Sequence, residues 1–381
     1  MKFLVLGSGL MGSAVAYDLA KSNGVTRVTL ADIDGARAAQ VTARIGSPLV
    51  HPRTLNVEYY DDVLAAMQGH DCAIGAVSYR HNHMLTRACI ESGVHFCDLG
   101  GNQDVVDRQR TLHDQALEGS VTIVPNCGLA PGFANVLAAR GAEQFQSVDS
   151  IQVRVGGLPQ HPRPPMNYQL VFSVDGLINE YMGESVVLRD FKRTTIPTMT
   201  EIESIDFPQP FGTLEAFHTS GGTSLLPEMF EGKVRTLDYK TIRYPGHCEK
   251  FRALLELGFA SSEPLSVGSN VMTAREIFSE LLKRKMSGDD EDVVLLRATI
   301  VGTRNGKTGT LEFSLIDSFD KNANISAMMR TTSYPTSVIA QQLADGTIQE
   351  RGVLTPEQCV PLRPLIDALH ARGIDIHETM K

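Results

Sequence analysis

Short apolar runs alternate with helical patterns along the first 125 or so residues of the chain. The runs have the length of buried strands, and they lie at Phe3–Leu6, Arg27–Ala31, Val57–Tyr60, Cys72–Val77, Val94–Asp98 and Val121–Pro125. Helical windows lie between them at Met11–Ser22, Asp61–Gln68, Met84–Ser92 and Val105–Leu117. Strands that alternate with helices predict an α/β fold with a parallel, doubly wound sheet of the Rossmann type.

The pattern changes beyond residue 125. A helical window at Gly132–Gln144 is followed by longer β-type runs, among them Ser150–Val155, Val293–Gly302 and Thr310–Phe319. Asn305-Gly306 separates the last two runs, and an Asn-Gly pair in that position predicts a hairpin. We therefore expect a second, α+β domain with a largely antiparallel sheet, followed by helices at Ser337–Ala344 and Pro361–Arg372. The predicted parts are residues 1–125, 126–325 and 326–381.

The segment Gly7-Ser8-Gly9-Leu10-Met11-Gly12 follows the first predicted strand and opens the first predicted helix. In that context the G-x-G-x-x-G pattern is typical of a dinucleotide site, especially when an acid follows about twenty residues later. Gly7 permits the tight turn, Gly9 lets the backbone approach the pyrophosphate, and Gly12 lets the helix pack closely on the strand. The helix N-terminus offers N–H groups and partial positive charge to the phosphates.

Asp32 ends the second predicted strand, where a carboxylate accepts hydrogen bonds from the adenosine ribose. A 2′-phosphate there would meet like charge, and Ile33 and Asp34 provide no cation for it. These features favour NAD over NADP, although Arg37 is close enough in sequence to weaken the preference. The alternative is a glycine turn beside a merely solvated aspartate. The predicted cofactor-binding residues are Gly7, Ser8, Gly9, Leu10, Met11, Gly12, Asp32 and Ile33.

Composition narrows the classes of partner. With 381 residues, 42% of them hydrophobic, the chain can form a sizeable core. Its net charge of −9 argues against nucleic acid, because phosphate binding needs a basic surface. No apolar stretch approaches the length of a membrane span. The six cysteines lack C-x-x-C spacing, which favours reduced thiols in a cytoplasmic protein. His81 and His83, with Cys89 and Cys97, fit no standard zinc spacing, so we predict no metal.

Several later segments combine glycine, aromatic and charged residues in ways that a packed core does not need. They lie at 126–132, 167–181, 215–222 (E-A-F-H-T-S-G-G) and 239–247 (Y-K-T-I-R-Y-P-G-H). With the glycine motif, they resemble the saccharopine dehydrogenase-like family, most closely its lysine 6-dehydrogenase branch, over nearly the whole chain. The resemblance implies that the C-terminal helices pack back on the Rossmann domain. It also implies that the central domain carries the substrate pocket and the contact of a homodimer or higher homo-oligomer.

The reaction implied by the resemblance is oxidation of the ε-amino group of L-lysine by NAD. The imine loses ammonia to water, and the semialdehyde closes to a cyclic imine. Many relatives carry an aspartate where this chain has Asn126, just before C-G-L-A-P-G. If that acid balances substrate charge in the relatives, the substrate of this protein is open to question.

Asp98 and Tyr79 follow predicted strands at the edge where ligands of open α/β sheets bind, and the resemblance also places polar active-site groups there. We expect Asp98 to balance an ammonium or iminium and Tyr79 to bond the substrate nitrogen or water. The alternatives are a helix or turn cap for Asp98 and a packed aromatic for Tyr79. Both residues are predicted to be catalytic.

An amino-acid substrate has a carboxylate, and the forked guanidinium of Arg243 is the natural partner for it. Lys240 is a second candidate, but three residues earlier in an extended strand it would face the opposite side. His218 lies beside a T-S-G-G turn and is a candidate proton shuttle. Tyr168 and Asp175 are candidates to hold the α-amino group and stem. An ordinary ion pair for Arg243 and a structural role for His218 are the alternatives.

Two other functions remain compatible with the residues. A saccharopine-type or opine-type reductase would join an amine to a carbonyl compound with NAD(P)H, and would need more than one carboxylate clamp. A non-catalytic NAD sensor would bind the dinucleotide without turnover. The polar segments of the second domain favour an enzyme over the sensor.

Overall fold

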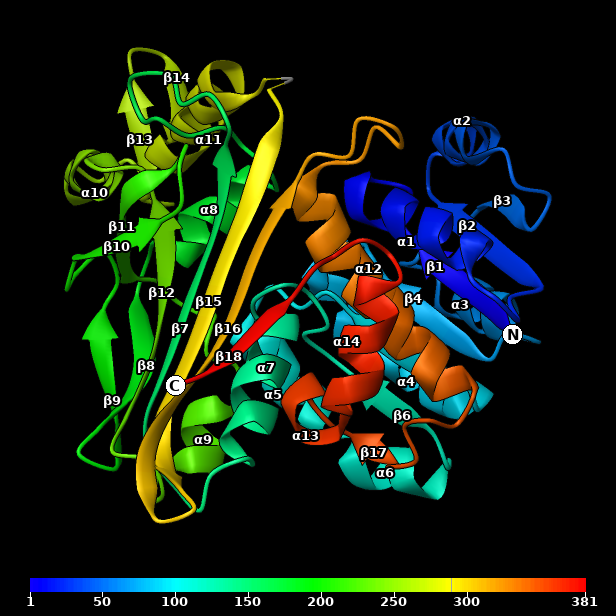
Figure 1. Cartoon of the computed structure of the whole chain (residues 1–381). Coiled ribbons are helices and arrows are strands. Elements are labelled where there is room, and N and C mark those ends of the chain that lie inside the picture. The colour runs from blue at the N-terminus through cyan, green and yellow to red at the C-terminus, as the bar shows by residue number, and fades with distance from the viewer. Residues whose placement is uncertain (289) are drawn as a thin grey trace. The chain divides into compact units, whose positions relative to one another are not determined.

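The chain forms two compact units in the computed structural model, which describes residues 1–288 and 290–381 (Figure 1). The first unit comprises Met1–Gln144 and Met329–Ile376. The second unit comprises Phe145–Met328 and His377–Lys381. Each unit has its own central sheet, and the dinucleotide motif belongs to the first.

The first unit contains a seven-stranded parallel sheet in the order β17-β6-β5-β4-β1-β2-β3. Its strands are β1 (Lys2–Leu6), β2 (Arg27–Asp32), β3 (Val50–Thr54), β4 (Cys72–Gly75), β5 (His95–Asp98), β6 (Thr122–Val124) and β17 (Gly352–Val353). Phe3, Leu4, Val5 and Leu6 are all fully buried, so β1 is covered on both faces. The predicted parallel, doubly wound sheet is confirmed.

Helices connect these strands and extend the first unit. They are α1 (Leu10–Lys21), α2 (Gly35–Ile45), α3 (Tyr60–Met67), α4 (Asn82–Ser92), α5 (Gln103–Arg110), α6 (His113–Glu118), α7 (Phe133–Ala142), α13 (Pro356–Cys359) and α14 (Leu362–His370). A 3-10 turn, η1, spans Tyr79–His81. Helix α12 (Ala327–Ala344) begins in the second unit and continues in the first.

Two predictions for this unit were wrong. The third strand is β3, with the sequence V-H-P-R-T, and Val57–Tyr60 lies in the connection to α3 and its first residue. The alternating polar residues of β3 hide it from a search for continuous apolar runs. The window Val105–Leu117 forms two helices, α5 and α6, instead of one. Helix α2, for which no window was predicted, connects β2 to β3.

The second unit has a nine-stranded mixed sheet, whose main path runs β10-β11-β12-β7-β15-β16-β18. Its strands are β7 (Ser147–Pro159), β8 (Glu184–Arg189), β9 (Lys192–Pro197), β10 (Glu203–Phe207), β11 (Gly212–His218), β12 (Thr236–Arg243), β15 (Asp292–Arg304), β16 (Lys307–Ser318) and β18 (His377–Met380). Strands β7 and β12 pair in parallel, and the other pairs are antiparallel. The largely antiparallel α+β arrangement is confirmed.

The long β15–β16 hairpin turns at Asn305 and Gly306, as predicted. Their φ angles are 51° and 74°, the positive values that a two-residue hairpin turn of this type requires. A small sheet of β13 (Pro264–Val267) and β14 (Asn270–Thr273) completes the β structure of this unit. Its helices are α8 (Val174–Glu180), α9 (Leu226–Phe230), α10 (His247–Glu256) and α11 (Ala274–Met286). Across both described ranges, no helix has the length and apolarity needed to cross a membrane.

Candidate dinucleotide site and buried arginine cluster

The three glycines of the motif occupy different environments at the carboxyl end of β1. Gly7 has a φ of 104°, and a Cβ there would lie 2.5 Å from the carbonyl oxygen of Ala76. A Cβ at Gly12 would lie 1.9 Å from the carbonyl oxygen of Gly7. A Cβ at Gly9 would meet no protein atom within 4 Å. Gly7 and Gly12 are therefore needed for the turn and its packing, whereas Gly9 leaves space for a ligand.

Gly9 is the N-cap of α1, and no side chain caps this helix. An anion placed there would meet backbone N–H groups and the positive end of the helix dipole. A cavity of about 310 Å³ opens beside the turn. Its lining comprises Gly7, Gly9, Ala31, Asp32, Ile33, Arg37, Leu55, Asn56, Val57, Glu58, Ala76, Val77, Ser78 and His81. The open space at Gly9 and the uncapped N-terminus of α1 are the features that a dinucleotide pyrophosphate would require here.

Asp32 is held in its ionised form at the end of β2. Its Oδ2 accepts hydrogen bonds from the Ser8 backbone N (2.6 Å) and Oγ (2.8 Å), and its Oδ1 accepts one from the Asp34 N (2.9 Å). Burial opposes the charge, but these bonds and one from Arg37 lower the pKa of Asp32 to about 2. The carboxylate is therefore available as an acceptor for ribose hydroxyls at neutral pH.

Arg37 binds the same carboxylate. Its Nη2 lies 2.8 Å from both Oδ1 and Oδ2 of Asp32, and its Nε lies 3.3 Å from Ser8 Oγ. The Arg37 side chain is 50% exposed, so its guanidinium can also meet a ligand in the cavity. Sequence reasoning treated Arg37 only as a nearby residue. The direct contact depends on the third position of α2, a helix that was not predicted.

Of the other predicted cofactor residues, only Ile33 lines this cavity, and it is 66% exposed. Ser8 is buried and bonded to Asp32, and Gly12 packs α1 against the turn. Leu10 is exposed, while the Met11 carbonyl accepts a hydrogen bond from Ser333.

Asp98, at the end of β5, is completely buried. Its Oδ1 accepts a hydrogen bond from the Gly100 N and its Oδ2 one from Gln109 Nε2, both at 2.7 Å. Burial raises the pKa of Asp98 to about 6, although the bonds from Gln109 and Gly100 oppose the shift. The bond to Gly100 is the turn cap considered as an alternative role.

Asn126, which follows β6, and Tyr79, in η1, lie against the loop that Asp98 caps. A Cβ at Gly100 would meet Asn126 Oδ1, and a Cβ at Gly101 would lie 3.1 Å from the Tyr79 ring. The Asn126 backbone also bonds Asp98. An aspartate at position 126 would therefore introduce a second acid beside a carboxyl that is already hard to ionise.

In the second unit, Arg243 lies at the end of β12, with 2% of its surface exposed. Its Nε donates to the Tyr181 hydroxyl (2.6 Å) and its Nη1 to the Ile242 carbonyl (2.9 Å). The guanidinium carbon lies 4.6 Å from the centre of the Tyr168 ring. Although burial disfavours its charge, Tyr181, Tyr168 and Glu180 raise the pKa of Arg243.

A chain of hydrogen bonds extends from Arg243 to His247. The Tyr181 hydroxyl lies 3.0 Å from His247 Nε2, and His247 Nδ1 lies 2.9 Å from the Met166 carbonyl. Because a carbonyl only accepts, Nδ1 carries the proton and Nε2 accepts from Tyr181. Burial is the main cause that lowers the pKa of His247 to about 3. His247 is the last residue of the 239–247 segment that carries the family resemblance, but no role was predicted for it from the sequence.

Glu180 is the carboxylate nearest to Arg243. Its Oε2 lies 3.7 Å from Arg243 Nη2, beyond a normal hydrogen bond, while its Oε1 accepts one from Thr241 Oγ1 at 2.6 Å. The Tyr168 hydroxyl is buried and has no hydrogen-bond partner in the described structure. We call these residues the arginine cluster: Arg243, Tyr181, Tyr168, His247 and Glu180. In this cluster Arg243 Nη2 has no carboxylate oxygen within hydrogen-bond distance, and the Tyr168 hydroxyl has no partner in the described structure.

Lys240 and His218 lie outside the arginine cluster, as the strand geometry predicts for Lys240. Lys240 Nζ donates to Glu203 Oε2 (2.8 Å) and to the Glu201 carbonyl (2.6 Å). His218 is fully buried, with Nε2 3.0 Å from Glu201 Oε2, and burial lowers its pKa. Asp175 is 75% exposed and lies 3.5 Å from Arg275.

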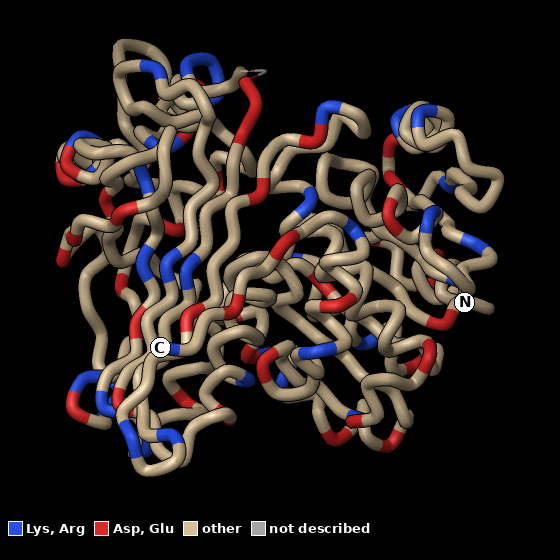
Figure 2. Tube along the Cα trace, in the orientation of Figure 1, with Lys and Arg blue, Asp and Glu red and all other residues tan. Residues whose placement is uncertain are grey.

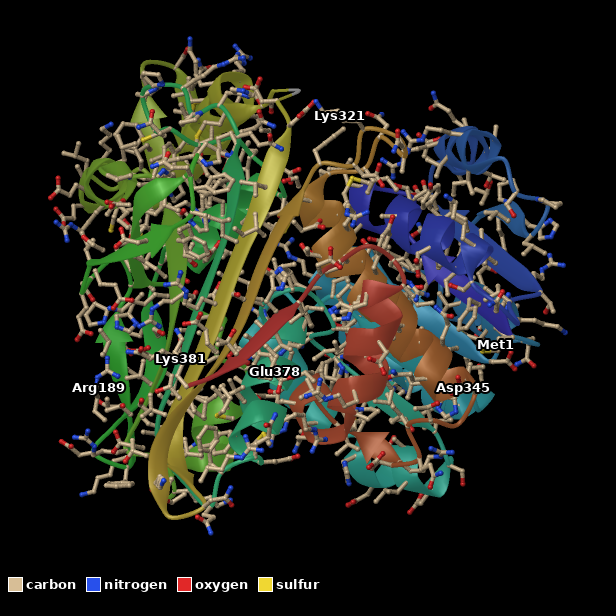
Figure 3. All side chains as sticks on the ribbon, in the orientation of Figure 1. Met1, Arg189, Lys321, Asp345, Glu378 and Lys381 are labelled. Atoms are coloured by element: carbon tan, nitrogen blue, oxygen red, sulfur yellow. The ribbon has the colours of Figure 1, made fainter. Side chains whose placement is uncertain are left out.

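Lys240 belongs to a row of basic residues across the sheet. In the strand register Lys240 is level with Arg154, and Arg154 with Arg297. Figure 2 shows blue positions side by side on neighbouring strands of the second unit. Arg154 pairs with Glu203 and Asp238. Arg189, labelled in Figure 3, reaches Asp238 Oδ2 at 3.2 Å. Glu203 and Asp238 thus supply carboxylates to Lys240 and Arg154, whereas Arg297 donates to the Asp206 carbonyl.

No group of three or more His, Cys, Asp or Glu side chains is placed to hold a metal ion in residues 1–288 and 290–381. All six cysteines are buried and free, including Cys89 and Cys97. The glycine turn, the acid at the end of β2 and the sheet order define a pyridine-nucleotide-binding unit of the Rossmann class.

The comparisons give the family. Residues 3–124 match the saccharopine dehydrogenase NADP binding domain, and residues 128–374 match the saccharopine dehydrogenase C-terminal domain. The chain belongs to the saccharopine dehydrogenase family, as the sequence resemblance predicted.

Among its relatives, saccharopine dehydrogenase [NADP(+), L-glutamate-forming] of Schizosaccharomyces pombe is 22% identical over 82% of this chain and 85% of the relative. The Saccharomyces cerevisiae enzyme of the same name is 20% identical over 93% of each chain. The mitochondrial alpha-aminoadipic semialdehyde synthase of Rattus norvegicus is 21% identical over 98% of this chain but 47% of the relative. The chain thus spans about half the length of the first curated relatives that it matches.

The fold matches that of apo histidine-tagged saccharopine dehydrogenase (L-Glu forming) from Saccharomyces cerevisiae. The TM-score is 0.81 with 18% sequence identity, over 100% of this chain and 99% of the other. At this identity the likeness establishes the fold, and the chemistry must be argued from the residues.

Proposed function

We propose that this protein is an NAD-dependent amino-acid dehydrogenase that oxidises the ε-amino group of L-lysine. Bound NAD would accept a hydride from the ε-carbon. The resulting iminium is attacked by water and releases ammonia, and the aldehyde condenses with the α-amine, with loss of water, to a cyclic imine. The reaction therefore needs a group for the substrate carboxylate, a neutral amine and access for one water.

The observation that carries the proposal is the incompletely paired guanidinium of Arg243. Its nearest carboxylate oxygen is 3.7 Å away, whereas Nε and Nη1 already have partners at 2.6 and 2.9 Å. A substrate carboxylate at Nη2 would complete its hydrogen bonding in a buried setting, where a charge-assisted bond is strong. The Tyr168 hydroxyl supplies a further donor or acceptor beside it.

Two acids have different proposed tasks. Asp98, with a pKa raised to about 6, can exchange a proton near neutral pH and can balance a positive nitrogen when ionised. Asp32 remains charged throughout this range and binds the adenosine ribose, which supports NAD as the cofactor.

A second candidate is the saccharopine-type reaction, in which an amine and a carbonyl compound condense with loss of water to an imine, and hydride from NAD(P)H together with a proton reduces the C=N bond to a secondary amine. Two observations favour it: the names of the relatives, and the position of Arg37 beside Asp32, where a guanidinium can meet a 2′-phosphate. Lys240 is not a free second carboxylate clamp for it, because Glu203 occupies its ammonium.

The two candidates are separated by steady-state assays with four substrate and cofactor pairs. Purified protein is given lysine or saccharopine with either NAD or NADP, and formation of the reduced dinucleotide is followed by absorbance. Our proposal expects turnover with lysine and NAD, with ammonia released in equal amount. Turnover restricted to saccharopine would establish the second candidate. Dinucleotide binding without turnover of lysine, saccharopine or the other members of an amino-acid panel would instead indicate an NAD sensor.

A further inference from the structure

A second cavity, of about 410 Å³, lies in the first unit near the amino ends of β1 and β2 and along β3. Its polar lining comprises Lys2, Arg27, Thr29, His51, Arg53, Gln68 and His70. The glycine turn lies at the carboxyl ends of the same strands, and the two cavities share no lining residue. The proposed dinucleotide chemistry therefore makes no use of this second cavity.

The strand register gathers these side chains on one face of the sheet. Lys2 is level with Arg27, and Thr29 is level with His51. Paired positions on neighbouring strands share a face, as do positions two apart on one strand, so Arg53 joins them. On the same face of the sheet, Leu4 and Leu6 are buried in the core that packs against α3. The five strand positions of this face that line the cavity are polar instead.

The cations in this cavity lack acidic partners. Within the described ranges, no carboxylate forms an ion pair with Lys2, Arg27 or Arg53. The nearby Asp71 carboxylate accepts a hydrogen bond from the Lys2 backbone N at 2.7 Å, and Arg27 Nε reaches only Thr29 Oγ1 at 3.4 Å. In a chain with a net charge of −9, three such cations around one cavity are an uncompensated charge that an anion would neutralise.

The positive charges of Arg27 and Arg53 both act on His70. His70 lines the cavity, and its Nε2 lies 2.9 Å from Thr29 Oγ1. Burial lowers the pKa of His70, and the positive charges of Arg27 and Arg53 lower it further. The carboxyl end of α3 also borders the cavity at Gln68, but its partial charge of about half a unit is small beside three full cations.

We propose that this cavity, called here the β1–β3 basic pocket, binds a small phosphate-bearing anion. Two guanidinium groups provide paired donors for phosphate oxygens, Lys2 adds a point charge and Thr29 a hydroxyl. A phosphate group carries close to two negative charges at neutral pH, which suits three cations better than a single carboxylate does. The volume exceeds that of one phosphate, so a diphosphate or an organic phosphate fits the pocket.

Isothermal titration calorimetry with sodium pyrophosphate tests the proposal at constant ionic strength set with sodium chloride. The wild type is compared with the double variant Arg27→Gln/Arg53→Gln, which retains every residue of the dinucleotide cavity. Any pyrophosphate bound at the glycine turn therefore contributes equally to both proteins. We expect the double variant to bind about tenfold more weakly or worse. Arg44→Gln, at an exposed arginine that lines neither cavity, should bind as the wild type does.

Two further arms complete the test. The second ligand is glucose 6-phosphate, an organic phosphate. If the pocket binds organic phosphates, the double variant should lose affinity for glucose 6-phosphate as well as for pyrophosphate. If the pocket binds inorganic phosphates, the double variant should lose affinity for pyrophosphate alone. Lys2→Gln, a single change at an exposed residue, gives a smaller loss in a protein whose fold is unaltered. Equal affinity in wild type and double variant overturns the proposal. Tighter binding of citrate than of either phosphate also overturns it, because the pocket would then select carboxylates.

Discussion

Arg37 and Asp32 form an ion pair in the lining of the cavity beside the glycine turn, with Nη2 of the arginine 2.8 Å from each carboxylate oxygen. The pair combines the two features that distinguish NAD sites from NADP sites: an acid for the ribose and a cation for a 2′-phosphate. The contribution of each residue to the preference between NAD and NADP can be measured by replacing one partner at a time.

We expect Arg37→Gln to weaken NADP binding by about tenfold or more and NAD binding by much less, because the unshielded Asp32 carboxylate would repel a 2′-phosphate. Asp32→Ala should have the opposite selectivity and weaken NAD markedly. Fluorescence titration with the reduced dinucleotides measures both. Arg44→Gln is the matched control. Equal losses for the two dinucleotides in both variants would remove Asp32 and Arg37 from cofactor selection.

Gly9 and Gly12 should respond differently to the same added methyl group. Gly12→Ala would bring Cβ within 1.9 Å of a backbone oxygen, and should lower the free energy of unfolding by more than about 2 kcal/mol. Gly9→Ala meets no protein atom, so unfolding should change by about 1 kcal/mol or less while dinucleotide affinity falls by about tenfold. Urea unfolding and ligand titration separate the two effects. Unchanged affinity in Gly9→Ala would contradict the proposed phosphate position.

Asp98 should make stability depend on pH. Its pKa is raised from 3.8 to about 6 in the fold, so it stabilises the folded state below the unfolded pKa and loses that contribution as pH rises through about 6. Relative to Asp98→Asn, which cannot ionise, the wild type should lose about 3 kcal/mol of unfolding free energy across this window. Urea unfolding at both ends of the window measures the difference. Parallel pH curves for the two proteins would show that Asp98 is not buried as a carboxylate.

Arg243→Lys should raise KM for the amino-acid substrate by about tenfold or more, because a lysine keeps the charge but loses the forked donors. Dinucleotide affinity should remain as in the wild type. Lys240→Arg is the matched change three residues away. It should leave KM unaltered because Lys240 is paired with Glu203 and lies outside the arginine cluster. The roles of the two residues would be exchanged if only Lys240→Arg changed KM.

Tyr168→Phe tests whether the unpartnered hydroxyl meets the substrate. Because that hydroxyl is buried without a hydrogen bond, its removal should leave the protein equally stable or more stable by about 1 kcal/mol. A rise in KM without loss of stability would then report a contact made only in the substrate complex. Unaltered KM would leave Tyr168 as a packing partner of Arg243.

Local patterns of the chain were sufficient for several features. The glycine motif and Asp32 follow the first strand and end the second strand of one strand–helix–strand unit, so their spacing alone predicts that they meet at the carboxyl edge of the sheet. The β15–β16 hairpin followed from Asn305-Gly306, whose positive φ angles are a local preference. By contrast, the third strand was predicted at the wrong residues because one face of β3 is polar. The tertiary structure explains that polarity, since His51 and Arg53 of β3 line the β1–β3 basic pocket.

The sequence by itself determined the Rossmann class of the first unit and the residues of the glycine turn, because those depend on short-range spacing and on conformations that glycine alone adopts freely. It also determined the family, through motifs distributed over nearly the whole chain. Only the tertiary structure decided that Arg37 binds Asp32, that His247 rather than His218 joins Arg243 through Tyr181, and that Lys2, Arg27 and Arg53 surround one cavity. Each of these contacts depends on strand order, register and burial, which bring together side chains whose separation along the chain carries no sign that they will meet.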